Sequence, residues 1–474
     1  MNSLKAIIIQ IVFILVIFTV SSFIYDAGIQ EFELTLSYLI VIQFAWQSLN
    51  FFRLNDTVVS IFYFFLLAGM LFNGGGFFVK IFNPTEYTLM TEITDLAVKR
   101  DTIIFVALCF SFLYLGALLY LNHGNLKSVK TIVYNQPVYI RTFRVVGFAL
   151  LAVSIVFEMS YMMDSLQVAM ANGYYALYGM EKVYGVDSVP KILRDFYIPA
   201  LYILYWCDVN SGNRRSLLWM IMIFVHCMLL FMIGFRGHSI MPILGFAILY
   251  DRCVARINIR KSFIIGAAVL FFVFPLIKNY RNAADKPTME AALEYLGDSF
   301  RELAILKEMG SSVKTVGYTQ TLVPAERDYA YGSGYFWAMT SIFPNIFTNG
   351  KHPAIENAHY SQWLTERVNP HAAAAGGGVG YSFIAEAYMN FSIFGVFFMV
   401  LLGYMLVKLD VFVMQKNTRL ILAASFTSFF LMYGRGEFLF VVRSLLWYSI
   451  GPYLMYKFLL QRAIKPKLFQ RINA

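Results

Sequence analysis

The feature that most limits how this chain can fold is a recurring run of apolar residues. Runs close to the ~20 residues that carry a helix across a ~30 Å hydrocarbon core return from one end of the sequence to the other. Of the 474 residues, 59% are hydrophobic and only 14% are charged, whereas a soluble domain has roughly 25% charged residues. A water-soluble fold cannot cover that much apolar side chain. The sequence therefore predicts a membrane protein, and its length counts membrane spans rather than globular domains.

Helices are favoured over a β-barrel because the runs are continuously apolar and because lipid offers no partner to an unpaired backbone group. The predicted fold class is all-α, a polytopic membrane helix bundle of about 12 transmembrane helices. The first run could be a secretory signal peptide, but no small-residue cleavage site precedes the next span, so we interpret it as a membrane helix. The spans are predicted at 4–24, 35–52, 57–79, 102–122, 144–163, 195–209, 215–235, 238–250, 262–277, 381–407, 418–433 and 438–460.

The positions of the basic residues predict the orientation of the chain. A net charge of +10 would suit nucleic acid, but Lys and Arg concentrate in the short segments between spans, which is typical of membrane orientation. Segments on the side of the N-terminus hold 20 basic residues, and short segments on the other side hold eight. We therefore expect both termini to be cytoplasmic and no nucleic acid to be bound.

The spans divide the chain into three regions. Residues 1–277 contain spans one to nine, residues 278–380 form one large, partly helical loop on the outer (periplasmic) side, and residues 381–474 contain spans ten to twelve and a basic cytoplasmic tail. In the loop, apolar residues recur every three or four positions from Thr288 to Met309, which predicts an amphipathic helix. Such a helix would rest on the membrane surface or on the helix bundle.

Motifs of soluble enzymes are missing from the sequence. It contains no phosphate-binding loop, no H-E-x-x-H helix and no C-x-x-C pair, so we expect no cofactor and no metal site. Two glycine runs, Gly74–Gly76 and Gly376–Gly378, lack the strand and helix context of a nucleotide site. We interpret both as a helix break or a flexible turn.

Two arginines stand beside glycines after predicted spans, Arg236 after the seventh and Arg435 after the eleventh. Glycine lets the backbone approach a ligand closely, and Arg offers a planar donor fork that suits phosphate. Arg443 lies within the last span, where a charge is costly and usually paired. We expect these arginines to meet at the outer face and bind an anion. The alternative is that they extend to the interface or pair with Glu437 or Glu158.

The outer loop contains half of the six histidines in the chain, His352, His359 and His371, and Glu386 follows in the tenth span. Histidine, or a carboxyl group with a raised pKa, exchanges protons near neutral pH, which suits a general base or a phosphate partner. A loop histidine can equally be a solvated surface residue. The spacing does not decide which of these groups faces a site.

The loop also carries an aromatic cluster that includes Tyr331, Tyr335 and Trp337. Aromatic residues beside a membrane usually anchor the protein at the interface. Such rings also stack on sugar rings, so the cluster is either an anchor or a glycan-stacking surface.

At these residues the sequence resembles the O-antigen polymerases, which polymerise the oligosaccharide repeat units of bacterial surface glycans. One matching stretch runs from YGSGY (residues 331–335) to IFP (342–344), and a second is GGGVGYSFIAEAYMNFSIFG (376–395). The Phe-Arg-Gly segment after the seventh span and the hydropathy of the whole chain are similar too. The resemblance rests on this combination, since no single motif is specific.

The resemblance implies a membrane glycosyltransferase of the GT-C type in the bacterial cytoplasmic membrane. Its donor and acceptor would be glycans carried on undecaprenyl pyrophosphate, joined at the outer face of the membrane. Membrane lipid would surround the protein, and a chain-length regulator protein would be a partner. The family resembles a metal-independent group of enzymes, so neither a metal nor a cofactor is implied.

The resemblance also implies roles for the candidate residues. Arginines would bind the lipid pyrophosphate: Arg236, Arg435, Arg443 and Arg281. A loop histidine or a carboxylate would take the proton from the acceptor hydroxyl: His359, His371 or Glu386. Aromatic rings would stack on the glycan: Tyr331, Tyr335 and Trp337.

The nearest alternative is an O-antigen ligase, which shares the donor and the loop but passes the glycan to lipid A-core. The Tyr-Gly-x-x-Tyr pattern followed by Pro favours the polymerase. A lipid-linked glycan transporter or flippase would show internal repeats and helices broken at the midplane, and no repeat is visible in the hydropathy. A purely structural assembly protein without an active site is a third alternative.

Overall fold

The computed structural model describes residues 3–27, 32–124, 126–172, 176–177, 188–276, 279, 289–343, 345 and 352–472. These residues are overwhelmingly helical. No β-strand occurs among them, and the isolated bridge between Ile132 and Lys416 is the only strand-like pairing that they contain. The predicted all-α fold class is therefore confirmed.

The first part of the chain forms a series of long helices and short connecting turns. Their bounds are α1 (Ser3–Ala27), α2 (Phe32–Asn55), α3 (Ile61–Phe82), α4 (Leu96–Leu121), η1 (Leu126–Ser128), α5 (Pro137–Asn172), α6 (Val189–Arg194), α7 (Tyr197–Asn210), α8 (Ser216–Ile233), α9 (Arg236–Cys253), α10 (Ile259–Ala268) and the π-helical turn η4 (Val269–Val273).

The predicted outer loop and the last part of the chain are also helical. The loop contains α12 (Met289–Arg301), α13 (Ala304–Met309), η5 (Gly310–Ser312), α14 (Val313–Leu322), α15 (Ser333–Thr340), α16 (Pro353–Ala358), α17 (Tyr360–Val368) and α18 (Pro370–Ala374). After it come α19 (Phe383–Phe391), η6 (Ser392–Phe394), α20 (Gly395–Met414), η7 (Asn417–Arg419), α21 (Leu420–Phe430), η8 (Leu431–Arg435), α22 (Phe438–Ser444), the π-helical turn η9 (Leu445–Ile450) and α23 (Gly451–Ile472).

Every predicted span falls on a helix. Eight helical stretches in the described residues are long and apolar enough to cross a membrane: 3–24, 61–82, 96–121, 137–171, 216–233, 259–276, 383–414 and 438–464. The other four predicted spans coincide with α2, α7, α9 and α21. Of these, α7 has 14 residues and α21 has 11, which is short for a crossing. The chain is thus a multi-pass helical membrane protein.

Polar side chains explain why α2 is less apolar than its neighbours. Gln43 and Gln47 are buried against α4, where their amide groups donate to the carbonyls of Ala107 and Phe110 at 3.5 and 3.3 Å. A buried amide needs such partners, because an unsatisfied polar group in an apolar setting costs free energy. These residues therefore hold α2 to α4 and lower its hydropathy without exposing polar groups to lipid.

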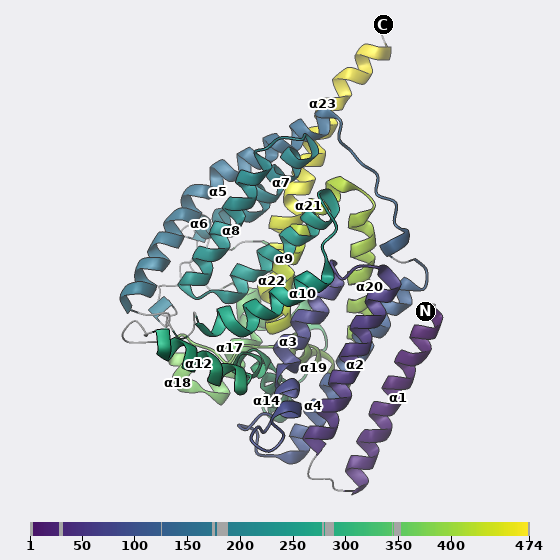
Figure 1. The fold of residues 1–474 in the computed structure, drawn as a ribbon, viewed down its shortest axis with the longest axis vertical. Helices are drawn as coiled ribbons and strands as arrows, with labels where there is room; N and C mark the ends of the chain where they lie inside the picture. The colour runs from purple at the N-terminus through teal and green to yellow at the C-terminus, as the bar shows by residue number, and fades with distance from the viewer. Residues whose placement is uncertain are drawn as a thin grey trace.

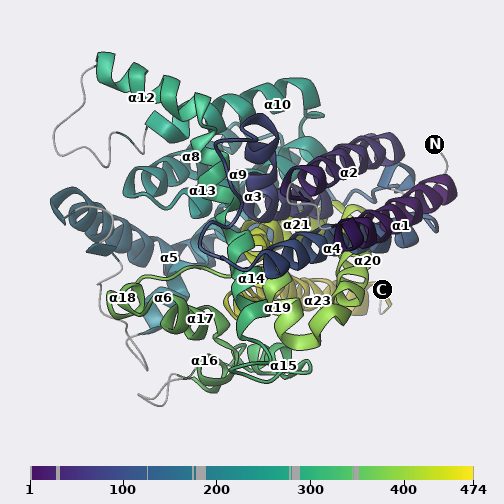
Figure 2. The same ribbon diagram turned by 90° about the horizontal axis from the view of Figure 1, so that it is seen from below.

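The helices place the loop away from both termini. The N-terminal end of α1 and the C-terminal end of α23 point toward the same end, whereas α12, α14, α17 and α18 lie toward the other end (Figure 1). Seen from that end, the loop helices spread over the bundle, with α12 on one side and α15 to α18 on the opposite side (Figure 2). This arrangement agrees with a loop opposite the termini.

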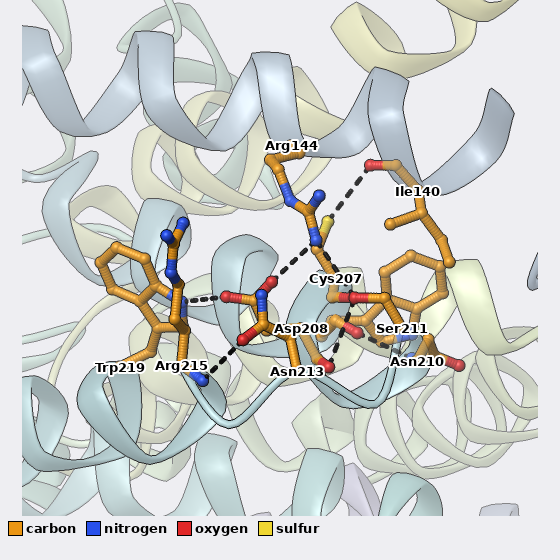
Figure 3. Close-up of polar contacts among 10 residues, drawn as sticks. Ile140, Arg144, Cys207, Asp208, Asn210, Ser211, Asn213, Arg215 and Trp219 are labelled. Atoms are coloured by element: carbon orange, nitrogen blue, oxygen red, sulfur yellow. Dashed lines mark hydrogen bonds and ion pairs between the residues drawn. The ribbon is translucent and has the colours of Figure 1, made fainter. Parts of the chain in front are cut away.

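A polar clamp ties α5, α7 and α8 together. The buried carboxylate of Asp208 accepts a hydrogen bond from Arg144 Nη2 and another from Trp219 Nε1, both at 2.7 Å (Figure 3). Arg144 also donates to the hydroxyl of Ser211 at 3.1 Å. The clamp pairs the charge of an otherwise isolated carboxylate, so it fixes these helix ends without leaving a buried charge uncompensated.

The predicted amphipathic helix is divided into two helices. Thr288 lies outside the described residues, and α12 and α13 are separated at Leu303, whose φ of 49° is left-handed. On α13, Ile305 and Leu306 are buried in an apolar cluster with Val79 of α3. We predicted that this segment lies either on the membrane surface or on the helix bundle, and α13 packs on the helix bundle.

The glycines of α3 allow the loop to pack closely on the bundle. We expected a break or a turn at Gly74–Gly76, but α3 runs through them without interruption, so that prediction is wrong. A Cβ atom on Gly310 of the loop would collide with backbone atoms of Gly75 and Gly76. The glycines thus serve as a flat contact between helix and loop. The second run does form a turn, in which Gly376 has a φ of 75°.

We predict that Gly310→Ala destabilises the protein by about 1–3 kcal/mol, the usual cost of overpacking. The added methyl group meets backbone atoms of α3, which cannot rotate away as a side chain can. The measurement is the thermal unfolding midpoint of the purified protein in detergent. Gly297→Ala in α12 is the matched control, because nothing lies within 4 Å of its added Cβ. Equal midpoints for both variants would refute the close contact.

Candidate active site

Two carboxylates lie together where α19 and α22 begin. Glu386 occupies the first turn of α19, and Glu437 is the residue directly before α22; both side chains are fully buried. Both oxygens of Glu386 accept from the backbone N–H of Phe438, at 3.2 and 3.0 Å. Glu386 therefore satisfies a free donor at the start of α22 and holds this helix against α19.

Asn73 of α3 fixes the same junction from the other side. Its amide nitrogen donates to the carbonyls of Gly69 and Gly434 at 3.0 and 2.9 Å. Its amide oxygen accepts from the hydroxyl of Ser382, the N-cap of α19, at 2.5 Å. One buried side chain thus connects α3, η8 and α19, and it sets where the turn after η8 lies.

Glu437 forms a pair with His359. Ser361 of α17 donates to the Glu437 carboxylate through its backbone N–H and its hydroxyl, each at 3.0 Å. His359 Nε2 lies 3.6 Å from Glu437 Oε1, and the histidine side chain keeps 21% of its surface exposed. Its ring packs edge-on against Phe440, with centroids 5.1 Å apart. A buried carboxylate that orients a partly exposed histidine is an arrangement suited to general-base catalysis.

The predicted catalytic residues are therefore only partly brought together. We expected a loop histidine to work with Glu386, but the structure places Glu437 beside His359, whereas Glu386 accepts from the backbone of Phe438. His371 is exposed on α18 and has no carboxylate within ion-pair distance among the described residues. The Gly-Arg-Gly-Glu segment that ends at Glu437 already stood out in the sequence. We had considered Glu437 only as an ion-pair partner for an arginine, not as the partner of a histidine.

Four buried tyrosine hydroxyls surround Glu386. They belong to Tyr335, Tyr360, Tyr381 and Tyr433, and the charge of Glu386 acts on each of them. None makes a hydrogen bond of standard geometry to a described residue. First burial and then this negative charge raise the pKa of Tyr335 and of Tyr360, so both stay protonated near neutral pH. The junction therefore places hydroxyl groups beside its carboxylates, and the Tyr433 hydroxyl lies close to both Glu386 and Tyr335.

The predicted glycan-stacking residues differ in their exposure. Tyr331 is 80% exposed. Tyr335 instead stacks on Phe398 at 4.7 Å and on Phe391 at 6.0 Å, so its ring belongs to an aromatic cluster and is not free to stack on a sugar. Trp337 is half-buried and packs on a small apolar cluster around Ala338. Of the three rings, only that of Tyr331 is exposed enough to stack on a sugar.

The predicted anion-binding arginines fall into two groups. The backbone of Gly237, next to Arg236, lies against Met432 of η8, so the segments that carry Arg236 and Arg435 are neighbours. Arg435 is exposed, with its guanidinium 5.9 Å from the ring centroid of Phe72. The side chain of Arg236 and the whole of Arg281 lie outside the described residues.

Arg443 belongs to the second group, on the face of α22 that His359 contacts. It follows Phe440 by three residues, a spacing that puts both on one helix face. Among the described residues, neither Arg443 nor Arg435 has a carboxylate within ion-pair distance. The suggested partners are engaged elsewhere, since Glu158 contacts Arg194 at 3.5 Å and Glu437 contacts His359. Arg435 and Arg443 are therefore not paired with Glu437 or Glu158, and for Arg236, whose side chain lies outside the described residues, the pairing stays a prediction.

The described residues do not gather metal ligands. No group of three or more His, Cys, Asp or Glu side chains among them is placed to hold a metal ion. The site consists of a histidine–carboxylate pair, buried tyrosines and cations, which can move a proton and bind an anion. Metal independence of the reaction stays a prediction.

Comparison with known proteins gives a family match over nearly the whole chain. Residues 7–467 match the family described as O-antigen polysaccharide polymerase Wzy. The chain is also similar to Protein CapE of Staphylococcus aureus, with 26% identity over 189 residues. That alignment covers 40% of this chain and 39% of the relative, so the chain spans well under half of the relative's length. No solved structure matches the chain.

We predict that Glu437 makes the stability of the protein depend on pH. Burial raises the pKa of its carboxyl group to about 8, although hydrogen bonds from Ser361 oppose this shift. The folded protein then binds a proton that the unfolded chain, with an ordinary pKa of 4.5, has lost. Stability from this group is therefore present at low pH and declines as pH rises from 4.5 through 8, by up to about 5 kcal/mol.

The measurement is the unfolding midpoint in detergent between pH 5 and pH 9 for the unmodified protein and for Glu437→Gln. The amide is neutral at every pH, so this variant should show a flatter profile. Glu366→Gln is the control, because Glu366 is exposed on α17 and its loss should leave the slope unchanged. An unaltered slope in Glu437→Gln would mean that Glu437 is ionised in the folded protein throughout this range.

Proposed function

Because the chain belongs to the O-antigen polysaccharide polymerase Wzy family, we propose that it polymerises oligosaccharide repeat units into a surface polysaccharide. The substrates are repeat units linked to undecaprenyl pyrophosphate at the outer face of the cytoplasmic membrane. Each has an apolar tail that suits lipid, a diphosphate that suits the arginines, and sugars that suit the exposed ring of Tyr331. The observation that carries the proposal is the pairing of His359 with Glu437 on the same face of α22 as Arg443.

The reaction moves the growing chain from its lipid carrier to the non-reducing end of a new unit. An acceptor hydroxyl attacks the anomeric carbon of the donor, a new glycosidic bond forms, and the bond to the diphosphate breaks. His359 accepts the proton of the attacking hydroxyl, and Glu437, which lies 3.6 Å from His359 Nε2, helps to orient the imidazole ring. The released lipid diphosphate carries the negative charge that develops, which Arg443 stabilises through charge-assisted hydrogen bonds.

The spacing along α22 supports this division of roles. His359 contacts Phe440, and Arg443 is three residues further along the helix, a rise of about 4.5 Å. The proton acceptor and the cation are therefore proposed to act within about one helical turn of each other on this face. Arg435 at the end of η8 and Arg236 at the start of α9 are proposed to bind the diphosphate as well. Arg281 stays a candidate on the basis of the sequence alone.

We predict that the purified protein converts a synthetic lipid-linked repeat unit into a ladder of products, without added divalent metal. His359→Ala should lower the rate by roughly 10²- to 10⁴-fold, as expected for loss of a general base. His123→Ala is the matched control, because His123 is an exposed histidine just beyond the C-terminal end of α4. A rate that collapses in chelator and returns with magnesium or manganese would contradict the mechanism. Transfer of one preformed glycan to lipid A-core, with no ladder, would identify a ligase instead.

Arg443 provides a second test of the site. A charge-assisted bond contributes about 1.5–3 kcal/mol, so Arg443→Ala should lower the rate by roughly one to two powers of ten. Arg443→Lys should restore only part of it, because Lys lacks the two-pronged donor geometry. Arg214→Ala, exposed on the other side of the bundle, controls for general loss of charge. Normal rates in Arg443→Ala at equal protein levels would remove Arg443 from the donor site.

We also predict that both termini are cytoplasmic and that the loop is periplasmic. Single cysteines at Asn357 and Arg215, both exposed, are introduced after replacing Cys109, Cys207, Cys227 and Cys253. In intact spheroplasts a membrane-impermeant thiol reagent should label position 357 and not position 215. Labelling of position 215 alone would invert the topology.

A further inference from the structure

A cavity of about 400 Å³ lies between the C-terminal ends of α4 and α20. Earlier in their length the two helices touch closely, because a Cβ atom on Gly116 of α4 would collide with the carbonyl of Val400 in α20. One turn later the ring of Tyr120 meets that of Tyr404, with centroids 5.1 Å apart. Tyr120 also lines the cavity, so this aromatic pair closes it on the side toward the middle of the helices.

The segment that follows α4 forms a second wall of the cavity and carries Lys130. Directly after Lys130, the hydroxyl of Thr131 donates to the carbonyl of Met414 at 2.8 Å. The backbone N–H of Ile132 donates to the carbonyl of Gln415, also at 2.8 Å. These two bonds tie the backbone beside Lys130 to the end of α20. The wall is therefore held in place before a ligand binds, which lowers the entropic cost of binding.

The polar side chains that bind a ligand here would be a cation and neutral donors. Lys130 is exposed and has no carboxylate within ion-pair distance among the described residues. The amide oxygen of Gln415 accepts from Arg419 Nη1 at 3.3 Å, which leaves the amide nitrogen of Gln415 as a donor. The hydroxyl of Tyr120 can donate as well. In the described part of the chain no acidic side chain lines the cavity, so it suits a negatively charged acceptor.

Other charged or titratable groups close to the cavity are already engaged. Asp410 of α20 accepts from the backbone N–H groups that begin α3, at 2.8 and 3.0 Å. His123 lines the cavity, but its Nδ1 lies 3.0 Å from the carbonyl of Leu119, so the ring forms part of the wall. Of the described residues that line the cavity, Lys130 is thus the cation that remains to bind an anion.

An exposed apolar surface continues from the cavity along the two helices. Leu401 and Met405 of α20 are exposed, and their four-residue spacing puts them on one face. Leu119 of α4 is exposed too. Leu119 and Met405 are the sequence neighbours of the two rings that close the cavity. In a membrane span such side chains face lipid, so a ligand can place apolar chains against them while its charged head contacts Lys130.

We propose that this cavity binds the phosphate headgroup of an anionic phospholipid. Its phosphate accepts hydrogen bonds from Lys130, Gln415 and Tyr120, and its acyl chains lie along the exposed face of α20. Basic pockets between membrane helices suit such headgroups. Helix α20 has 20 residues and a length of about 30 Å, so the cavity lies about one hydrocarbon thickness from the end of α20 that adjoins α19. The inference thus goes beyond the proposed function and concerns the opposite leaflet.

The test measures how many lipids bind to the purified full-length protein in a nonionic detergent, by native mass spectrometry. A first molecule of phosphatidylglycerol should bind more tightly than one of phosphatidylcholine, which carries no net charge. Lys130→Ala should weaken the binding of phosphatidylglycerol roughly fivefold, as expected for the loss of one cation at a membrane surface. Lys130→Arg should retain most of the affinity. Lys127→Ala is the matched control, because Lys127 lies on the same segment and is paired with Asp56 at 3.4 Å.

A second variant tests the cavity itself without removing a charge. Gly124 lines the cavity, and a Cβ atom added to it meets nothing within 4 Å. Gly124→Leu should therefore fill part of the space without displacing its neighbours, and it should weaken the binding of phosphatidylglycerol.

Three results would overturn the inference. The first is equal affinity of the unmodified protein for the two lipids. The second is normal binding of phosphatidylglycerol in Lys130→Ala or in Gly124→Leu at a normal unfolding midpoint. The third is binding of inorganic phosphate that depends on Lys130 while binding of phosphatidylglycerol does not, because the cavity would then take a free anion.

Discussion

The hydrogen bond between the Glu386 carboxylate and the backbone N–H of Phe438 is the contact on which the functional region depends. It closes the start of α22 where the chain turns sharply after η8. In a membrane protein a broken helix is tolerated only where its free backbone groups find partners inside the protein. Glu386 and Asn73 supply those partners from α19 and α3. The turn that exposes Arg435 and buries Glu437 exists because these two side chains hold its ends.

The loop helices depend on that junction in turn. Ser361 bonds to Glu437 with both its backbone and its hydroxyl, which fixes α17 and so the position of His359. On the other side, Gly310 sits directly on the glycines of α3. The predicted loop is therefore packed on the bundle at two separate places. A histidine on a free loop would be poorly placed for catalysis, whereas one held between Glu437 and Phe440 keeps a defined orientation.

The charges of this region are arranged by degree of burial. Carboxylates occupy the centre, where backbone and hydroxyl donors satisfy them, and cations lie further out on α6, η8 and α22. An anionic substrate would meet the cations first, while the carboxylates are shielded from it by the packed helices. The histidine lies between the two zones, in contact with a carboxylate and partly open to solvent. This order suits a reaction in which a proton moves inward as a diphosphate leaves.

The sequence by itself determined where the helices lie, because hydropathy and period are local properties of the chain. All twelve predicted spans are helical, and the second glycine run forms the expected turn. Only the tertiary structure decided what single polar and small residues do. The sequence predicted a break at Gly74–Gly76, but the close approach of Gly310 explains these glycines. It also offered Tyr335 as a stacking surface, but the ring packs against Phe391 and Phe398. The partner of His359 was likewise decided by packing, since Glu437 is 78 positions away and no spacing rule connects two residues that meet only through the junction of α17 and α22.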